Sequence, residues 1–330
     1  MGCGGGEEPG ARGHYNAGVE LQGRGRLPDA IAEYDEAIRL NPANVDAYFN
    51  RGLSYHYLGL YQRAIQDYDE TIRLNPDDAD AYFNRGLDYH YLGLYQRAIQ
   101  DYDQAIRLNP DDADSYLNRG LDYLSLEQYQ QAIDDYDEAI RLNPALASLY
   151  SNRGFAYAGL GELERAIQDL DEAIRLDPDL AIAYSNRGNV YFNLGQYQRA
   201  IQEFDEVIRL NPDDAGAYFD RGFANAGLGQ HHRAIQDYDE AVRLDPENAE
   251  PYNNRGLAFA DLGRYQRAMN DYDVAISLDP DSALAYGNRA IAHTYLGADT
   301  KADRDIETAL VLGIDRVELL QFLERARQAR

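Results

Sequence analysis

The chain has 330 residues and a formal net charge of −26, set by 57 acidic and 31 basic side chains. So strong an acidic excess argues against a surface that binds nucleic acids or anionic lipids, since both require clusters of Lys and Arg. The composition, 45% hydrophobic with no tryptophan, lacks the apolar runs of a membrane protein. We therefore expect a cytoplasmic protein that has neither nucleic acid nor a membrane among its partners.

The first ten residues, MGCGGGEEPG, have the composition of a flexible arm and lack the apolar segment of a secretion signal. Cys3 is the sole cysteine, so neither an internal disulfide nor a cysteine-rich zinc site can form. Gly2 and Cys3 match the start of a doubly acylated protein, but Gly6 stands where the myristoylation pattern requires Ser or Thr. The sequence leaves lipidation of these residues open.

Eight prolines divide the sequence that follows into segments of equal length. Successive prolines are 34 residues apart, at Pro42, Pro76, Pro110, Pro144, Pro178, Pro212, Pro246 and Pro280. The segments 45–78 and 79–112 differ at only four positions. A fixed period of this length is typical of a solenoid of stacked helical repeats.

Each repeat carries two helical apolar patterns. In the repeat 79–112, a first pattern spans 82–92 and ends at a Leu-Gly pair, and a second spans 95–108 and ends before Pro110. Each repeat is therefore predicted to be an antiparallel helix pair that needs its neighbours to bury its apolar faces. The expected fold is all-α, a right-handed superhelical solenoid of such pairs.

This pattern resembles the tetratricopeptide repeat (TPR) family. The family pattern of aromatic, Gly, Tyr, Ala, aromatic, Ala and Pro matches Tyr82, Gly86, Tyr89, Ala98, Tyr102, Ala105 and Pro110. The resemblance implies a single extended array over 11–314, with repeats at 11–44, 45–78, 79–112, 113–146, 147–180, 181–214, 215–248 and 249–282 and a degenerate one at 283–314. We attribute the signature glycines, which weaken a helix, to close approach of the paired helices at the alanine opposite.

The last segment, 315–330, is predicted to be a capping helix. One side carries either Val317, Leu320 and Leu323 or Leu319, Phe322 and Leu323, and polar residues lie elsewhere. A terminal cap of a solenoid needs a polar outer face.

An arginine precedes the signature glycine in repeat after repeat, for example Arg51, Arg85 and Arg119. The facing helices carry an acid at the matching place, such as Asp67 and Asp101, so we predict inter-helix arginine–carboxylate pairs between layers of the array. A role of these arginines in binding a ligand is the alternative.

The residues show no arrangement typical of catalysis or of cofactor or metal binding. His56 and His90 occupy the same place in two near-identical repeats, which duplication explains. Acidic pairs such as Asp67 and Asp69 recur along the array, as a solvated surface would. No glycine-rich phosphate loop is present. We therefore expect no enzyme activity, no cofactor and no metal.

The sixth residue of each repeat belongs to a row of amides. The row consists of Asn16, Asn50, Asn84, Asn118, Asn152, Asn186, Asp220, Asn254 and Asn288. An amide has both a donor and an acceptor, so such a row can bond to the alternating N–H and C=O groups of an extended peptide. It is similar to the asparagine ladder in the TPR region of O-linked N-acetylglucosamine transferases. In the alternative interpretation, each asparagine bonds to the backbone of a neighbouring helix.

In TPR proteins a stripe of residues on the first helices lines a concave peptide-binding surface, and the resemblance assigns this role to the side chains around the amides. The predicted apolar binding residues are Phe49, Leu53, Phe83, Leu87, Leu121, Phe155 and Phe223. His56, Tyr57, His90 and Tyr91 belong to the same stripe. An exposed apolar strip is typical of a protein-binding surface, and packing between repeats is the alternative.

The charges around this stripe indicate the kind of partner. Acidic residues such as Asp46 and Asp80 at the entrance favour a neutral or basic, partly apolar peptide. The carboxylate clamp of some TPR co-chaperones is disfavoured, because Phe49 and Leu53 stand where that clamp has Lys or Arg. We predict a non-enzymatic adaptor that binds an extended segment of another protein. The alternative is a structural spacer or self-assembling scaffold without a groove ligand.

Overall fold

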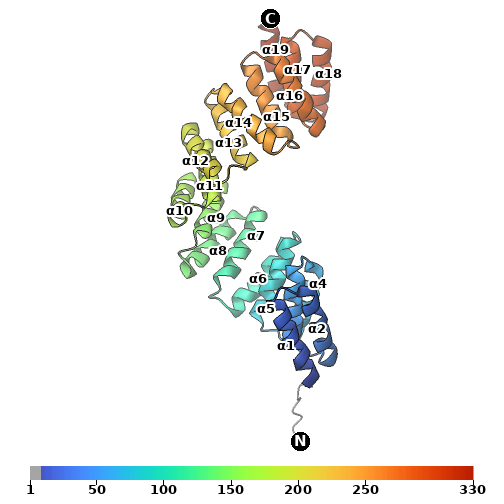
Figure 1. Ribbon diagram of the computed structural model, residues 1–330. Coiled ribbons are helices and arrows are strands. Elements are labelled where there is room, and N and C mark those ends of the chain that lie inside the picture. Colours follow the sequence, from blue (N-terminus) through green and yellow to red (C-terminus); the bar gives the residue numbers. More distant parts are fainter. Residues whose placement is uncertain (1–8, 330) are drawn as a thin grey trace. The chain divides into compact units, whose positions relative to one another are not determined.

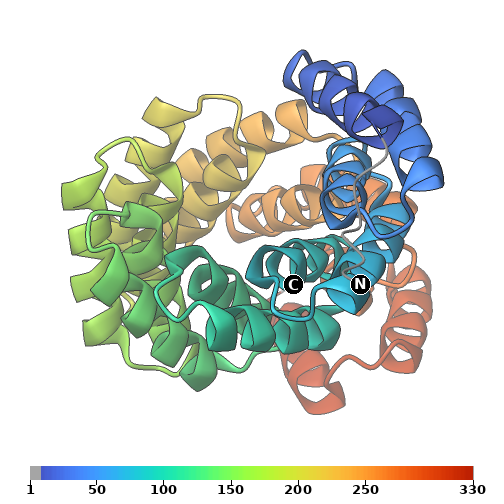
Figure 2. The same cartoon turned by 90° about the horizontal axis from the view of Figure 1, so that it is seen from below.

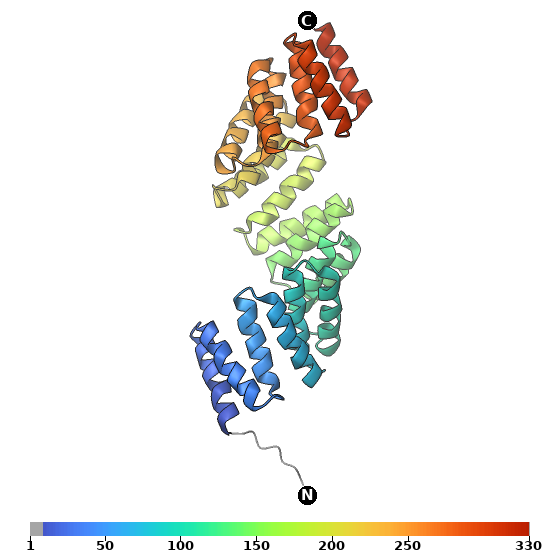
Figure 3. The ribbon, with the colours of Figure 1, turned by 90° about the vertical axis from the view of Figure 1, so that its right-hand side faces the viewer.

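The structure is a computed structural model that describes residues 9–329. The helices form two compact units, one ending at Leu176 and the other beginning at Asp177, and each is described by itself. Within each unit, consecutive helices lie side by side in antiparallel pairs (Figure 1). Figures 2 and 3 show the same pairing from two other sides. Helices alone, without strands, make up the described residues, so the prediction of an all-α array of helix pairs is confirmed.

The N-terminal unit contains ten helices among its described residues. They are α1 (Pro9–Gly23), α2 (Leu27–Leu40), α3 (Val45–Tyr57), α4 (Tyr61–Leu74), α5 (Ala79–Tyr91), α6 (Tyr95–Leu108), α7 (Ala113–Ser125), α8 (Tyr129–Leu142), α9 (Ala147–Gly159) and α10 (Leu163–Leu176).

The C-terminal unit contains four further pairs and one single helix in the part that the structure describes. They are α11 (Ala181–Asn193), α12 (Tyr197–Leu210), α13 (Ala215–Gly227), α14 (His231–Leu244), α15 (Ala249–Asp261), α16 (Tyr265–Leu278), α17 (Ala283–Tyr295), α18 (Asp299–Val311) and α19 (Arg316–Gln328).

Local sequence signals set these helix ends. The side chain of Asp78 accepts a hydrogen bond from the backbone N–H of Ala81 at 3.0 Å, which caps the start of α5. The turn to α6 passes through Gly93 at a φ of 70°, a conformation that glycine adopts without strain. The second helix ends before Pro110, as predicted. The proline recurs with its fixed period, while α9 and α11 begin without a side-chain cap and Glu127 takes the place of the glycine at a φ of 56°.

The N-terminal boundary differs from the expected one. The flexible arm was expected over 1–10, but α1 begins at Pro9, so Pro9 and Gly10 are helical. Proline is tolerated in the first turn of a helix because no intrahelical partner awaits its missing N–H. The remainder of the expected arm, including Gly2 and Cys3, lies outside the described residues.

The signature glycines make room for a buried side chain of the second helix, an aromatic ring in most repeats and Leu170 at Gly154. A Cβ atom added to Gly86 would lie 2.7 Å from Cε1 of Tyr102, and the Tyr102 side chain is fully buried. The sequence-based explanation, close approach at the opposite alanine Ala98, is therefore wrong in detail. The ring of the second helix lies on the glycine and needs the space that any side chain would occupy.

Several of these buried tyrosines have a hydroxyl without a partner. Among residues 9–329, no hydrogen bond is made by the hydroxyls of Tyr68, Tyr102 and Tyr136. Tyr34 differs, because its hydroxyl donates to Oε1 of Gln22 at 2.6 Å. A buried polar group without a partner destabilises the folded state by about 1–3 kcal/mol.

Replacing Tyr102 with phenylalanine is therefore expected to leave the free energy of unfolding unchanged or to raise it by about 1 kcal/mol. The matched change Tyr34→Phe removes a hydrogen bond and is expected to lower it by about 1 kcal/mol. Urea denaturation of both variants, followed by circular dichroism, measures the difference. Equal losses in the two variants would contradict the assignment of a partnerless Tyr102 hydroxyl.

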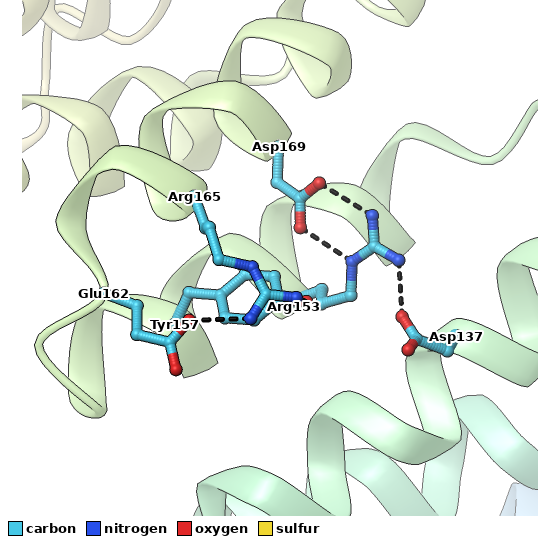
Figure 4. A network of polar contacts seen from close by, with 6 residues as sticks. All are labelled: Asp137, Arg153, Tyr157, Glu162, Arg165 and Asp169. Carbon is cyan, nitrogen blue, oxygen red and sulfur yellow. Dashed lines mark hydrogen bonds and ion pairs between the residues drawn. The ribbon is translucent and has the colours of Figure 1, made fainter.

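The repeated arginines join consecutive repeats. In Figure 4, Arg153 on α9 donates to both carboxylate oxygens of Asp169 on α10, at 2.7 Å each, and to Asp137 on α8 at 2.5 Å. The predicted inter-helix pair forms with the expected acid, but it joins the two helices of one repeat and not two layers. The second carboxylate, from the preceding repeat, was not predicted. The same contact to the preceding helix pair of the same unit is made by Arg51, Arg85, Arg119, Arg221, Arg255 and Arg289.

The last helix, α19, packs on α17 through Leu319 and Leu323, which are buried against Ala290 and Ala309. This confirms the second of the two sides considered for its apolar face, except that Phe322 is 44% exposed. The expected polar outer face is wrong in part, because Val317 and Leu320 on α19 are also exposed. The helix covers the end of the core but leaves apolar side chains on its own surface.

Candidate peptide-binding surface

Three amides of the N-terminal unit donate to carbonyls of their own helices, and one of them, Asn50, also donates to the Tyr15 hydroxyl on α1 at 3.3 Å. The Nδ2 atoms of Asn84 and Asn118 donate to the carbonyls of Asp80 and Asp114, one turn earlier, at 2.8 Å each. Asn50 does the same at 2.9 Å. The alternative interpretation, a bond to a neighbouring helix backbone, is therefore wrong for these three residues. No described residue donates to the amide oxygens of Asn84 and Asn118, so these acceptors are available to a ligand.

The other members of the row have different surroundings. Asn16 is exposed and Asn152 is half-buried. Asn254 accepts a hydrogen bond from Asn253 at 3.4 Å, and Asn253 in turn accepts one from Asn288 at 3.0 Å. Amides of two successive repeats are thus linked in the C-terminal unit. Asn186 is half-buried on α11.

The apolar residues of the N-terminal unit lie at two depths. Phe83 packs against the buried Tyr102 with a ring separation of 5.9 Å, and Phe49 packs in the same way against Tyr68. These phenylalanines and the residues Leu53, Leu87 and Leu121 are half-buried. Tyr57 and Tyr91 are more exposed, at 65% and 56%. Phe155 on α9 is also exposed.

Two histidines of this stripe bond to buried aspartates of the next repeat. Nδ1 of His56 lies 2.7 Å from Oδ1 of Asp88, and Nδ1 of His90 lies 2.5 Å from Oδ1 of Asp122. Both aspartates are fully buried. Burial raises the pKa of Asp122, and the hydrogen bond to Asp122 raises the pKa of His90. Sequence reasoning missed these links, because the recurrence of the histidines was attributed to duplication alone.

The His90 pair predicts a dependence of stability on pH. Because the pKa of His90 is raised above its ordinary 6.5 in the folded state, its stabilising contribution is complete below about pH 6.5 and is lost as the pH rises through the raised value. The raised pKa of Asp122 acts in the same direction, starting above its ordinary 3.8. Tyr102, which faces Asp122, stays neutral throughout, because burial and the Asp122 charge raise its pKa.

We therefore expect the thermal unfolding midpoint of the wild type to fall between about pH 6 and about pH 8, and the His90→Gln variant to show a smaller fall. Differential scanning calorimetry at a series of pH values measures this. His232→Gln, at an exposed position, serves as the control and is expected to follow the wild type. A His90→Gln variant with an unchanged pH profile would contradict the assignment.

In the C-terminal unit the stripe surrounds a cavity of about 460 Å³ between α13, α15 and α17. Phe219, Phe223, Leu257 and Leu284 form its apolar walls, and Asn253, Asn254, Asn288 and Glu250 lie among its polar lining. The ring of Phe223 also stacks on Phe192 at 4.9 Å. The structure thus brings the predicted residues Phe223, Asn254 and Asn288 to one cavity.

The sequence analysis missed Leu284 as a candidate site residue. Leu284 lines this cavity and is 63% exposed. Leu284 is the second residue of its repeat, a position held by aspartate in the repeats around Asp46 and Asp80. The change from an acidic to an apolar residue at a stripe position was the available signal.

A second cavity of about 510 Å³ lies where α19 meets α15, α16 and α17. Its walls include Phe322, Arg325 and the stacked rings of Tyr265 and Tyr295, whose centroids are 4.3 Å apart. Leu257 and Asn288 line both cavities. The last helix therefore borders the same stripe that the amides follow.

Asp220 is the exception in the row of amides. No described residue forms a hydrogen bond or ion pair with its half-buried carboxylate. Burial raises the pKa of Asp220 to about 6, and the nearby charges of Asp214 and Glu250 add to the shift. This carboxylate therefore takes up a proton more readily than an exposed aspartate does, and a nearby positive charge would stabilise its ionised form.

Within the part of the chain that the structure describes, no group of three or more His, Cys, Asp or Glu side chains is placed to hold a metal ion. The search for described helices long and apolar enough to cross a membrane also found none.

Family models account for most of the sequence. A model described as TPR repeat matches residues 23–59, 120–161, 159–195, 188–229, 227–263 and 256–297, and two models described as tetratricopeptide repeat match 45–78 with 79–112, and 101–134. The chain belongs to the tetratricopeptide repeat family. The TPR matches and the helix pairs agree in placing the repeats along both compact units.

Solved TPR-like structures share the fold. The APC/C hetero-tetramer Cut9-Hcn1 matches 81% of this chain and 52% of its own with a TM-score of 0.60 and 19% identity. A tetratricopeptide repeat protein from Parabacteroides merdae ATCC 43184 matches 75% of this chain and 98% of its own with a TM-score of 0.58 and 20% identity. At these identities the likeness shows the fold alone. A search of curated proteins gave no match.

Proposed function

We propose that this TPR protein is a non-enzymatic adaptor whose first-helix stripe binds an extended segment of another protein. The observation that carries the proposal is the state of the amides in the N-terminal unit. Asn84 and Asn118 use one donor on their own helices and keep their acceptors available. Repeated acceptors on successive helices suit the N–H groups of an extended backbone, which do not depend on peptide sequence.

The side chains around the amides supply the apolar part of such an interface. Tyr57 and Tyr91 are large and exposed, and aromatic residues of this kind contribute strongly to protein interfaces. In the C-terminal unit, the cavity between α13, α15 and α17 offers space for one apolar side chain of a partner. The acidic residues that border both stripes favour a neutral or basic segment.

A displayed library of random linear peptides tests this function on the full-length chain. Peptides enriched by the wild type are synthesised, and their affinities are measured by fluorescence anisotropy. The double variant Asn84→Ala, Asn118→Ala is expected to bind peptides that contact the N-terminal unit at least about tenfold more weakly, since two hydrogen bonds are lost.

The matched control replaces two exposed amides on the second helices, Gln62→Ala with Gln96→Ala, and is expected to bind like the wild type. Circular dichroism confirms that all variants are folded. Failure of the wild type to enrich any peptide would contradict the proposal and favour a spacer or self-assembling scaffold.

A further inference from the structure

Asp220 interrupts the row of amides. Its repeat also lacks the aspartate that several other repeats carry four residues before the amide. In α3, α5 and α7, the second residue of the helix is an aspartate and an asparagine follows four residues later, as with Asp80 and Asn84. In α13 the corresponding residues are Gly216 and Asp220. The negative charge has moved one helical turn along the first helix, from the exposed edge to the half-buried row.

The carboxylate of Asp220 cannot form the hydrogen bond to its own helix that Asn84 forms. Asn84 satisfies its Nδ2 by donating to the carbonyl of residue 80, but ionised Asp220 has no hydrogen to donate. The charged groups near it do not compensate it. Asp214 caps the start of α13 by accepting from Ala217, and Glu250 lies on α15, so both add negative charge, while Tyr238 on α14 is neutral. A half-buried carboxylate in this setting destabilises the unliganded protein.

Two aromatic neighbours of Asp220 along α13 line a cavity. Phe219 and Phe223, on the same helix, form walls of the cavity of about 460 Å³ between α13, α15 and α17. Phe223 follows Asp220 by three residues, so the two side chains lie on neighbouring turns of one face. No Arg or Lys lines this cavity, whereas Glu250 and Asp279 do. The surroundings therefore combine exposed aromatic surface with uncompensated negative charge.

We propose that the C-terminal unit selects an extended peptide whose arginine side chain pairs with Asp220 while a neighbouring apolar side chain fills the cavity walled by Phe219, Phe223 and Leu257. This inference rests on the proposed function and names its partner more closely. A guanidinium suits both the carboxylate and the aromatic rings, because it donates hydrogen bonds to a carboxylate and stacks on an aromatic ring. The bound guanidinium would also compensate the negative charge of half-buried Asp220, which destabilises the protein without a ligand.

The test begins with the peptides that the full-length wild type enriches from the random library. We expect an arginine beside an apolar residue to be overrepresented among those bound by the C-terminal unit. For one such peptide, affinity is compared with that of its Arg→Gln analogue, using the wild type and the Asp220→Asn variant. Asparagine stands at the same position in eight other repeats, so this variant is expected to fold.

The expected results form a double-mutant cycle. Asp220→Asn should weaken binding of the arginine peptide by about tenfold and leave binding of the glutamine analogue unchanged within about twofold. Asp213→Asn removes an equal charge from the exposed loop before α13 and is expected to have little effect on either peptide. Thermal unfolding checks that the variants remain folded.

Proton release gives a second measure. Without a peptide, the pKa of Asp220 is raised to about 6. A bound guanidinium would lower this pKa, so protonation of Asp220 competes with binding at low pH. The affinity for the arginine peptide should therefore rise between about pH 5 and about pH 7. The Asp220→Asn variant should lack this rise.

The outcomes separate the two proposals. If enriched peptides lose affinity with the asparagine variants of the N-terminal unit but show no dependence on arginine or on Asp220, the adaptor function stands and this inference is overturned. If the wild type enriches no peptide, both are overturned.

Discussion

Replacing Arg119 with glutamine is expected to lower the stability of the repeats around it by about 3 kcal/mol, because it leaves a buried carboxylate without its partner. Arg119 donates from Nε to one oxygen of Asp135 at 2.9 Å and from Nη2 to the other at 2.5 Å. Asp135 is only 4% exposed. Burial raises the pKa of Asp135, and the hydrogen bond and the charge of Arg119 oppose this shift.

The same change also cuts the connection to the preceding repeat. Nη1 of Arg119 donates to Asp103 on α6 at 2.5 Å, and the guanidinium lies 5.6 Å from the ring centroid of Tyr116. In an array where each repeat is stabilised mainly by its neighbours, a weakened contact between two repeats lets them open separately from the rest. We therefore expect faster amide hydrogen exchange in α6, α7 and α8 than in more distant helices.

Hydrogen exchange followed by mass spectrometry measures this effect helix by helix, which suits an array that need not unfold in one step. The control is Arg141→Gln, which removes an exposed arginine paired with Glu138 three residues away. Such surface pairs contribute about 0.5 kcal/mol or less. Similar exchange in the two variants would show that the bidentate pair contributes no more to stability than the surface pair does.

The second large effect is expected from Gly86→Ala, which should lower stability by about 2 kcal/mol although alanine favours helices. The added methyl would stand 2.7 Å from Cε1 of Tyr102 and 3.0 Å from Cδ1. The ring cannot easily withdraw, because it is fully buried and Phe83 packs against it. The helix pair must therefore separate or the ring must adopt a strained rotamer, and either change weakens the core.

Gly13→Ala provides the matched control. Gly13 is also helical, in α1, but no atom would lie within 4 Å of its added Cβ. We expect this variant to gain up to about 1 kcal/mol from helix propensity alone. Thermal unfolding and hydrogen exchange of the two variants should give changes of opposite sign. A stabilised Gly86→Ala variant would mean that the contact with Tyr102 relaxes without loss.

The period of the prolines was sufficient to predict the helix pairs, because a breaker every 34 residues and a Leu-Gly pair between them leave few other arrangements. Bonds inside a repeat were also predictable, as for the arginine and the acid that follows it by 16 residues. Contacts to the next repeat were harder to predict from the sequence. His56 and Asp88 are 32 residues apart, and nothing in either residue alone indicates that they meet across the repeats.

The amides show a different limit. Their spacing correctly marked one row on the first helices, but the pattern could not tell whether their donors serve a ligand, a neighbouring helix or their own helix. That choice depends on side-chain rotamers, and the own-helix bond of Asn84 to Asp80 follows from a spacing of four residues that every helix contains. Asp220 was visible in the sequence as a substitution, but its burial and its acidic neighbours were not.

The spacing of the arginine pairs has a consequence for how such a chain can change its length. The two partners of Arg119 lie 16 residues before and after it, at Asp103 and Asp135. If residues 79–112 were excised, Asp69 would take the place of Asp103, and the same bond could form. A whole repeat can therefore be lost or gained during evolution while the new junction keeps its ion pair, whereas an insertion between Asp103 and Arg119 would change the 16-residue spacing of that pair.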